Sequence, residues 1–194
     1  MPPLLTPFLT QQRRKAILPY VRGDILDLGC GLAQICHTLQ PEQTYIGIEN
    51  PTEYVNWLRV RYPQHTFLQR DLEKEPINLD RCFETVIMGA IIEHLKEPGF
   101  LLQQIPGYLE PGGRLVITTP TPLGDKIHRL GARLGLFSMD AVEEHQKIYD
   151  RGALTGLLAQ YDFSAMHYQY FLLGGNQLLV CQPGNTPTPK SEST

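Results

Sequence analysis

Short apolar runs and longer amphipathic segments alternate along most of the chain. Apolar runs predict buried strands, which we place at 25–28, 44–48, 65–69, 83–88, 114–118, 163–170 and 177–182. Apolar residues spaced three or four apart predict helices, which we place at 11–21, 32–39, 51–62, 99–109, 125–134 and 151–161. Because strands and helices alternate, we predict an α/β fold with a doubly wound, seven-stranded, mostly parallel sheet that carries helices on both faces.

Two of the predicted helices divide clearly into inward and outward positions. In the helix at 51–62 the side chains expected to be buried are Tyr54, Val55, Trp57 and Leu58. In the helix at 11–21, Ile17 and Leu18 are expected to face the core. The basic residues of this second helix, Arg13, Arg14 and Lys15, are therefore expected to form a solvated face.

The most informative local pattern follows the first strand, at Asp27-x-Gly29-x-Gly31. Two glycines two residues apart allow a sharp turn and a close approach of the backbone to a ligand. Asp27 stands at the strand end, where open α/β sheets bind ligands, and the following helix is expected to point its N-terminal amides into the same space. A dinucleotide-binding turn has Gly or Ala at its sixth position, where this chain has Gln34, so a nicotinamide or flavin cofactor is disfavoured.

Acidic residues also end the second and third predicted strands. Glu49 follows the turn by about 20 residues, which is the spacing of an acid that binds ribose hydroxyls. Its alternative role is a solvent-exposed cap for the next helix. Asp71 ends the third strand, where it either contacts a ligand or caps the short turn at 72–75. The residues alone leave both roles of Asp71 open.

Three motifs stand in order within residues 24–120: Asp27-x-Gly29-x-Gly31-x-Ala33, Glu93-His94-Leu95, and Pro111-Gly112-Gly113. Together they resemble the class I methyltransferases that use S-adenosylmethionine, with Ala33 in place of a third glycine. The resemblance implies a Rossmann-like fold whose last strand lies antiparallel beside the fifth. It also implies S-adenosyl-L-methionine as cofactor and S-adenosyl-L-homocysteine as product.

The same resemblance implies which residues contact the cofactor. These residues are Asp27, Gly29, Cys30, Gly31, Glu49, Asp71, Leu72, Met88, Gly89 and Ala90. Asp27, Gly29 and Gly31 would hold the methionine part, and Glu49 would hold the ribose. Asp71 and the backbone N–H of Leu72 would hold the adenine, and the last three would line the side of the sulfur.

Histidines are the candidates for a general base, because their pKa lies near neutral pH. His94 follows the fourth strand, and His145 lies in a long segment at about 120–148 that we interpret as a substrate lid. Related O-methyltransferases bind a divalent metal through Glu-x-x-Glu-His, but Ala90 replaces the first Glu here, so no metal is expected. Glu93 and His94 are instead expected to support the site as a hydrogen-bonded helix start. O-methylation of a hydroxyl acceptor is the favoured hypothesis.

Composition narrows the class of substrate. The 194 residues carry a net charge of −3, without a basic bias toward nucleic acid or an anionic membrane, so a small-molecule acceptor is expected. The four cysteines form no Cys-x-x-Cys pair, which favours a reducing, cytoplasmic environment. No apolar run approaches the length that spans a membrane.

We expect a single methyltransferase domain over 1–182 and a disordered polar tail over 183–194. A monomer and a homodimer both fit the sequence. Three other functions remain open. One is a catalytically silent binding module with the same fold, and another is a Rossmann oxidoreductase, which Gln34 disfavours. The third is a tRNA or protein methyltransferase, which the charge balance does not support.

Overall fold

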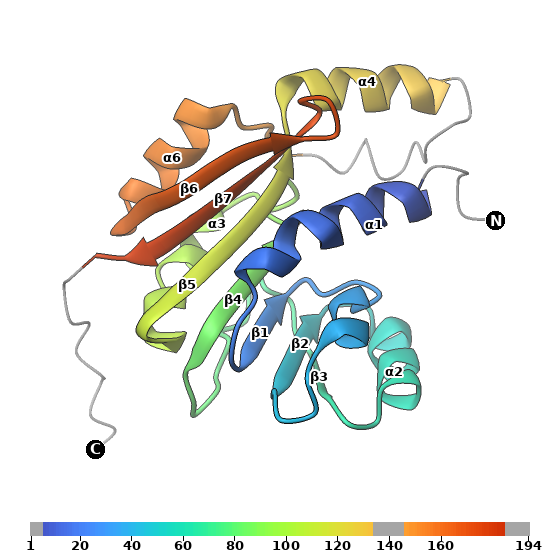
Figure 1. Ribbon diagram of the computed structural model, residues 1–194, viewed down its shortest axis with the longest axis vertical. Helices are drawn as coiled ribbons and strands as arrows, with labels where there is room; N and C mark the ends of the chain where they lie inside the picture. Colours follow the sequence, from blue (N-terminus) through green and yellow to red (C-terminus); the bar gives the residue numbers. More distant parts are fainter. Residues whose placement is uncertain (1–5, 134–145, 185–194) are drawn as a thin grey trace.

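The computed structural model of the chain describes residues 6–133 and 146–184, and within them seven strands form one sheet (Figure 1). The strand order is β3-β2-β1-β4-β5-β7-β6. Strand β7 is antiparallel to both of its neighbours, and the other paired strands are parallel. The strands are β1 (Ile25–Leu28), β2 (Tyr45–Glu49), β3 (Thr66–Gln69), β4 (Phe83–Gly89), β5 (Leu109–Pro120), β6 (Phe163–Phe171) and β7 (Asn176–Pro183). The predicted α/β sheet with its antiparallel strand beside the fifth is confirmed.

Helices cover both faces of this sheet. The α-helices are α1 (Thr6–Ile17), α2 (Thr52–Arg61), α3 (Pro98–Leu102), α4 (Pro122–Arg133) and α6 (Arg151–Ala159). The 3-10 helices are η1 (Leu18–Tyr20), η2 (Gln34–Thr38) and η3 (Ile105–Tyr108). One core cluster holds apolar side chains of α3, η3 and α6, and the other holds those of α1, η2 and α2. The sheet is therefore packed on both sides, which explains its continuous apolar strands.

The strand order reverses direction at β1, which lies between β2 and β4. The register pairs Leu28 with both Ile48 and Met88, so the carboxyl ends of these three strands lie level. In an open parallel sheet a ligand crevice opens at such a reversal, beyond the carboxyl ends of the strands. The fold therefore places the residues that follow β1, β2 and β4 around one crevice.

The predicted helix at 32–39 is wrong. Ala33 has a left-handed backbone, with φ of 48°, and only the five residues of η2 wind into a 3-10 helix. A left-handed residue cannot belong to a right-handed helix, so no α-helix begins at 32. Pro41 follows closely and leaves little chain in which a longer helix could form.

Other differences concern helix faces and boundaries. Helix α2 buries Val55 and Leu58, but Tyr54 and Trp57 are exposed, because the helix packs against β3 and β2 at one edge of the sheet. Helix α1 begins at Thr6 rather than at 11, and α4 begins at Pro122 rather than at 125. The single helix predicted at 99–109 is divided into α3 and η3, and Pro106, which has no backbone N–H to donate, lies in η3.

Helix α4 is seated on the turn between β6 and β7. Thr121 donates its hydroxyl to Gly174 O, at 2.7 Å, and the same hydroxyl accepts from Gly124 N, at 3.0 Å. A Cβ built on Gly124 would come within 1.8 Å of the carbonyl oxygen of Gly175. The helix therefore needs a glycine at this contact.

No helix within the described residues is long and apolar enough to cross a bilayer.

Two helical glycines give a matched test of this seating. Gly124→Ala is expected to lower the free energy of unfolding by about 1–3 kcal/mol, because backbone atoms of Gly175 must move. Gly156→Ala, in α6, has open space around its Cβ and is expected to raise the same free energy by about 0.5–1 kcal/mol. Chemical denaturation followed by circular dichroism measures both. Equal effects of the two substitutions would contradict the contact.

Candidate functional site

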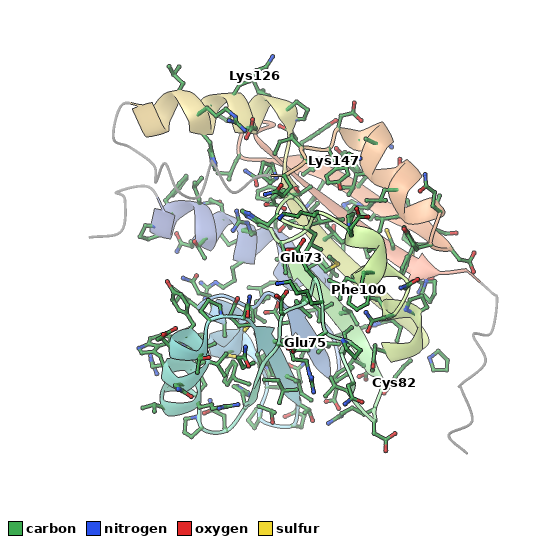
Figure 2. All side chains as sticks on the ribbon, turned by 180° about the vertical axis from the view of Figure 1, so that it is seen from behind. Glu73, Glu75, Cys82, Phe100, Lys126 and Lys147 are labelled. Carbon is green, nitrogen blue, oxygen red and sulfur yellow. The ribbon has the colours of Figure 1, made fainter. Side chains whose placement is uncertain are left out.

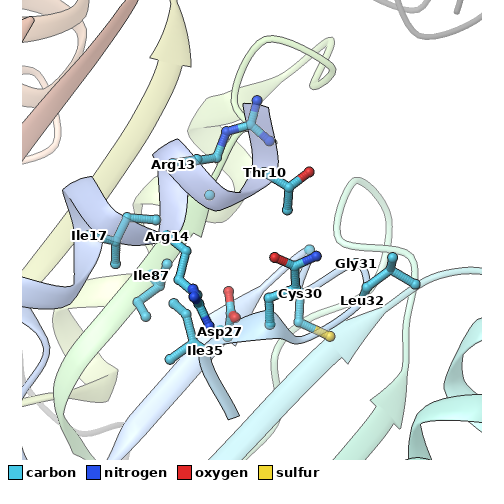
Figure 3. Close-up of a pocket in the computed structure, with 13 residues that line it drawn as sticks. Thr10, Arg13, Arg14, Ile17, Asp27, Cys30, Gly31, Leu32, Ile35 and Ile87 are labelled. Atoms are coloured by element: carbon cyan, nitrogen blue, oxygen red, sulfur yellow. The ribbon is translucent and has the colours of Figure 1, made fainter. Parts of the chain in front are cut away.

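Two neighbouring cavities lie at the carboxyl edge of the sheet and meet at Gly29. The first, here called the α1 cavity, has a volume of about 280 Å³ and lies between α1 and the turn after β1 (Figure 3). The second, the β2–β3 cavity, has a volume of about 160 Å³ and is lined by residues that follow β2, β3 and β4. Together they form the crevice that the strand order predicts.

The turn after β1 separates the two cavities and is tied to the end of β2. Gly29 N and Cys30 N both donate to Ile48 O, at 2.9 and 3.1 Å. Gly29 and Gly31 have φ of 69° and 52°, and a Cβ at Gly29 would lie 2.5 Å from the side chain of Ile91. The turn therefore requires glycine at 29 for both its conformation and its packing.

The amides of this turn do not line up as the sequence predicts. Gly31 N donates to the Oε2 of Glu49, at 2.7 Å, and Ala33 N donates to Cys30 O. Because η2 is a 3-10 helix of only five residues, it provides little of the helix dipole that the sequence predicts. Side chains that line the α1 cavity are a second source of positive charge for an anionic group.

Asp27 lines the α1 cavity and is almost completely buried. Its Oδ2 accepts a hydrogen bond from the hydroxyl of Tyr45, at 2.7 Å. Burial raises the pKa of Asp27 to about 7, the Tyr45 hydroxyl opposes this rise, and the negative charge of Glu49 adds to it. Asp27 thus titrates near neutral pH. Burial and nearby carboxylates also raise the pKa of the Cys30 thiol, which stays neutral in the same cavity.

Glu49 lines the β2–β3 cavity with both carboxylate oxygens already oriented. Its Oε2 accepts from Gly31 N and its Oε1 accepts from Asn50 N, at 2.9 Å. Helix α2 has Pro51 at its N-cap and no side-chain cap, so Glu49 does not cap it. Each oxygen keeps a lone pair for a further donor. The carboxylate can therefore accept two hydroxyl groups from a ligand.

Asp71 caps the turn that follows β3, which is one of the two roles left open above. Its carboxylate accepts from Glu73 N, at 3.1 Å, and from Lys74 Nζ, at 2.9 Å. These two hydrogen bonds hold the pKa of Asp71 below its usual value, and the bond from Lys74 contributes more than the bond from Glu73. The carboxylate is therefore ionised at neutral pH. Asp71 and Leu72 also line the β2–β3 cavity.

The residues at the end of β4 divide between core and cavity. Gly89 lines the α1 cavity, but Met88 is fully buried in the core on the opposite face, and Met88 and Ala90 line neither cavity. Successive side chains of a strand point to opposite faces, so Ile87 lines the cavity instead of Met88. Ile91 lines the β2–β3 cavity. The alternation along β4 shows from the sequence that only one of Ile87 and Met88 can face the cavity.

His94 lines the β2–β3 cavity, together with Glu49 and Asp71. Glu93 is 1% exposed, and its Oε2 accepts from the hydroxyl of Thr119, at 3.0 Å, so it ties the segment after β4 to β5. This segment is a hydrogen-bonded turn rather than a helix start.

His145 lies outside the described residues, as do parts of the predicted lid and tail. No metal-binding cluster of His, Cys, Asp or Glu side chains is found in the described ranges.

The sequence analysis missed two cationic residues of the site. Arg13 and Arg14 line the α1 cavity from α1, and the Nε of each is buried without a hydrogen-bond partner in the described structure (Figure 3). Burial lowers the pKa of Arg13, against the effect of the nearby carboxylate of Glu93. The predicted solvated face is therefore wrong for both arginines, although Lys15 is exposed. They precede the buried Ile17 by four and three residues, a spacing that places them on its face.

Comparison with known proteins agrees with this geometry. A family model described as a methyltransferase domain matches residues 5–168. A trans-aconitate 2-methyltransferase of Rhodopseudomonas palustris is 27% identical over 109 residues, which cover 54% of this chain and 41% of that protein. A tRNA U34 carboxymethyltransferase of Citrifermentans bemidjiense is 30% identical over 117 residues, which cover 57% of this chain and 36% of that protein. The chain thus spans less than half the length of these relatives.

Solved structures share the fold at low sequence identity. A glycopeptide N-methyltransferase complexed with S-adenosyl-L-methionine has a TM-score of 0.68 at 17% identity, covering 91% of this chain and 87% of that one. An S-adenosylmethionine-dependent methyltransferase from Mesorhizobium loti has a TM-score of 0.68 at 17% identity, covering 87% and 94%. The chain therefore belongs to the methyltransferase domain family and has the fold of the class I S-adenosylmethionine-dependent methyltransferases.

Proposed function

We propose that this protein transfers a methyl group from S-adenosyl-L-methionine to a small-molecule acceptor, with a hydroxyl oxygen as the favoured acceptor atom. One observation carries the proposal. The acids that end or follow β1, β2 and β3, namely Asp27, Glu49 and Asp71, line two cavities that meet at Gly29. This arrangement offers separate positions for the amino-acid, ribose and adenine parts of one elongated ligand.

The α1 cavity fits the amino-acid part of the cofactor. Its carboxylate needs a cation, and Arg13 and Arg14 reach this cavity with unpartnered Nε atoms. Its ammonium needs a carboxylate, and Asp27 is available in the same cavity. The arginine side chains supply the positive charge that the short η2 does not provide. Opposite charges in this small space therefore match the two charges of the ligand.

The β2–β3 cavity fits the nucleoside part. Glu49 is held by two backbone amides and can accept both ribose hydroxyls. Asp71 and Leu72 line the same cavity, and there the carboxylate and the backbone N–H would recognise adenine. When bound, the cofactor supplies an activated methyl group on a sulfonium. The protein contributes orientation and exclusion of water, and His94 is the residue proposed to accept a proton from a hydroxyl acceptor.

The relatives differ in the acceptors that their names state, one being trans-aconitate and the other a tRNA. A net charge of −3 supports the small molecule, because proteins that bind nucleic acid gain most of their affinity from cationic side chains. A tRNA acceptor is the second candidate, supported by the carboxymethyltransferase relatives.

The cofactor class is tested by calorimetric titration with S-adenosylhomocysteine and, separately, with NADH. We expect micromolar binding of the first and none of the second. Glu49→Ala is expected to weaken S-adenosylhomocysteine at least about tenfold, because two hydrogen bonds to an ionised group are lost. Glu53→Ala, on the exposed face of α2, is the matched control. A Glu49→Ala affinity within twofold of the wild type would exclude the ribose role.

Binding without turnover would favour the silent module. Formation of S-adenosylhomocysteine is therefore followed with panels of small hydroxy compounds, small carboxylic acids and tRNA. Turnover with a small acceptor supports the proposal, and turnover with tRNA alone contradicts it.

The two arginines are tested by comparing ligands that differ only in the amino-acid part. Arg13→Met and Arg14→Met are expected to weaken S-adenosylhomocysteine about tenfold in at least one of the two variants, because a charge-assisted bond is lost. Neither should change the affinity of methylthioadenosine, which lacks the carboxylate. Lys15→Met, exposed on the same helix, is the control. An equal loss for both ligands would mean that the arginines only support the fold of α1.

The raised pKa of Asp27 predicts a pH dependence with a definite sign. The unfolded chain releases this proton near its ordinary pKa of 3.8, but the folded protein keeps it until about 7. The free energy of unfolding should therefore fall as pH rises from about 4 to 7, by on the order of 1 kcal/mol per pH unit, and level off above 7. Asp27→Asn should lose this part of the pH dependence. Identical pH profiles of the two proteins in urea denaturation would refute the assignment.

The same group should appear in binding. An ionised Asp27 attracts the ligand ammonium, so the affinity for S-adenosylhomocysteine is expected to rise between pH 5.5 and 8 in the wild type and to change less in Asp27→Asn.

A further inference from the structure

Two buried polar side chains lie at the carboxyl end of β5 and at the start of β7. Thr118 is fully buried and Asn176 is 3% exposed, and neither Thr118 Oγ1 nor Asn176 Oδ1 has a hydrogen-bond partner in the described structure. Folding has removed water from both atoms without supplying a replacement, which costs free energy. Because most buried polar groups of native proteins are paired, these two atoms require an explanation.

The neighbouring residues in the sequence point to the opposite face of the sheet, and there the polar groups are paired. Thr119 donates its hydroxyl to Glu93 Oε2, at 3.0 Å. Gln177 donates to Tyr149 O, at 2.5 Å, and its side-chain oxygen accepts a hydroxyl, at 2.7 Å. The Nζ of Lys147, just before α6, lies 5.4 Å from the ring centroid of Tyr149 and helps to cover this face (Figure 2). Both neighbours are therefore satisfied within the protein.

The two unpaired atoms lie on the face of the sheet that α1 covers. Val116 and Leu178 belong to the same core cluster as Ile17 of α1. Side chains two residues apart on a strand share a face, so Thr118 and Asn176 also face α1. Thr118 is the register partner of Leu178, which makes Asn176 its diagonal neighbour, on the order of 7 Å away. A small ligand can therefore contact both side chains.

This pair of side chains adjoins the α1 cavity. Thr118 is the register partner of Gly89, which lines that cavity. Because Gly89 has no side chain, β4 presents only backbone between the cavity and Thr118. The heavy atom nearest to a Cβ built on Gly89 is the Cδ1 of Ile17, at 3.7 Å, so the surface of the glycine is not crowded. A ligand in the α1 cavity can therefore extend across Gly89 to Thr118.

The two arginines of the α1 cavity point in different directions. Figure 3 shows the side chain of Arg14 directed toward Asp27 and the guanidinium of Arg13 directed away from it. The carboxylate of Glu93, in the segment that follows β4, acts on the pKa of Arg13, in agreement with this direction. The amino-acid part of the cofactor has one carboxylate, and Arg14 is sufficient for it. Arg13 is therefore available for an anionic group of a second ligand.

We propose that Thr118, Asn176 and Arg13 bind the methyl acceptor, and that this acceptor is a small hydroxy acid. Asn176 Oδ1 can only accept, so it needs a donor such as a hydroxyl, and Thr118 can bond to the same group. Arg13 offers a planar pair of N–H donors, which matches a carboxylate. The inference rests on the proposed methyl transfer and adds to it the class of the acceptor and the residues that select it.

Stability separates a binding role of Thr118 from a structural one. Thr118→Val removes a hydroxyl that makes no bond within the protein, so the midpoint of urea denaturation should stay the same or rise. Thr85→Val is the matched control, because this buried hydroxyl donates to Arg22 O, at 2.7 Å, and accepts from Arg22 N, at 3.0 Å. The control should lower the midpoint. An equal fall in both variants would show that the Thr118 hydroxyl is structural and would overturn the assignment.

Acceptor selection is measured as formation of S-adenosylhomocysteine from three matched sets of compounds. Malate and salicylate are hydroxy acids, succinate and benzoate lack the hydroxyl, and butanediol and phenol lack the acid. We expect at least one hydroxy acid to be used at least about tenfold more efficiently than its two matched compounds.

The variants then assign each group. Thr118→Val and Asn176→Leu should raise the KM of that hydroxy acid about tenfold, with a smaller change in kcat, because a hydrogen bond to the acceptor is lost. Arg13→Met should reduce the preference for the hydroxy acid over the matched alcohol. The affinity for S-adenosylhomocysteine should stay within twofold of the wild type in all three variants. Thr85→Val should leave the acceptor kinetics unchanged.

Failure of the inference can be told apart from failure of the proposed function. Turnover of neutral hydroxy compounds without turnover of any hydroxy acid overturns the inference and leaves small-molecule methyl transfer intact. A KM that none of the three variants changes also overturns it, as does a loss of S-adenosylhomocysteine affinity in Thr118→Val or Asn176→Leu, since these residues would then serve the cofactor. A wild type that does not bind S-adenosylhomocysteine, or that methylates tRNA alone, contradicts both proposals.

Discussion

The bonds between the turn after β1 and the end of β2 are the constraint on which the site depends. Two amides of the turn converge on Ile48 O, and a third is held by the carboxylate of Glu49. These bonds fix where one cavity ends and the next begins, since Gly29 lines both. They also orient Glu49, so the acid that would hold a ribose is positioned before any ligand arrives. Preorganisation of this kind lowers the cost of ordering the site upon binding.

Using the turn amides in this way has an electrostatic consequence. Because these N–H groups are paired within the protein, the crevice obtains its charge from side chains that lie on different elements. Asp27 comes from β1, and Arg13 and Arg14 come from α1. A site whose cations lie on a separate helix binds its ligand only when that helix is in place. Helix α1 is held in place by Ile17, which is buried against the sheet. The packing of Ile17 therefore also positions the two arginines that bring positive charge to the cavity.

Much of the fold could be predicted from the sequence, because each strand is a short apolar run whose pattern is local. The candidate site was predictable to the extent that it lies at strand ends: Asp27, Glu49 and Gly29 line the two cavities. The prediction failed where a side chain's direction mattered. Met88 points into the core and Ile87 points toward the cavity. These two side chains lie on opposite faces of β4, and only the tertiary structure shows which face the site occupies.

The sequence by itself determined the α/β class, the seven strands and the acids at three of their ends, since apolar periodicity and turn residues act over a few neighbouring positions. Only the tertiary structure decided that Arg13 and Arg14 face a cavity, and that α4 turns its apolar stripe outward. Both depend on which surface a helix meets. A helical pattern shows that the two faces of a helix differ, but the surface on which the helix packs decides which face is buried. For α4 that surface includes the backbone of Gly175, which leaves room only for a glycine at position 124.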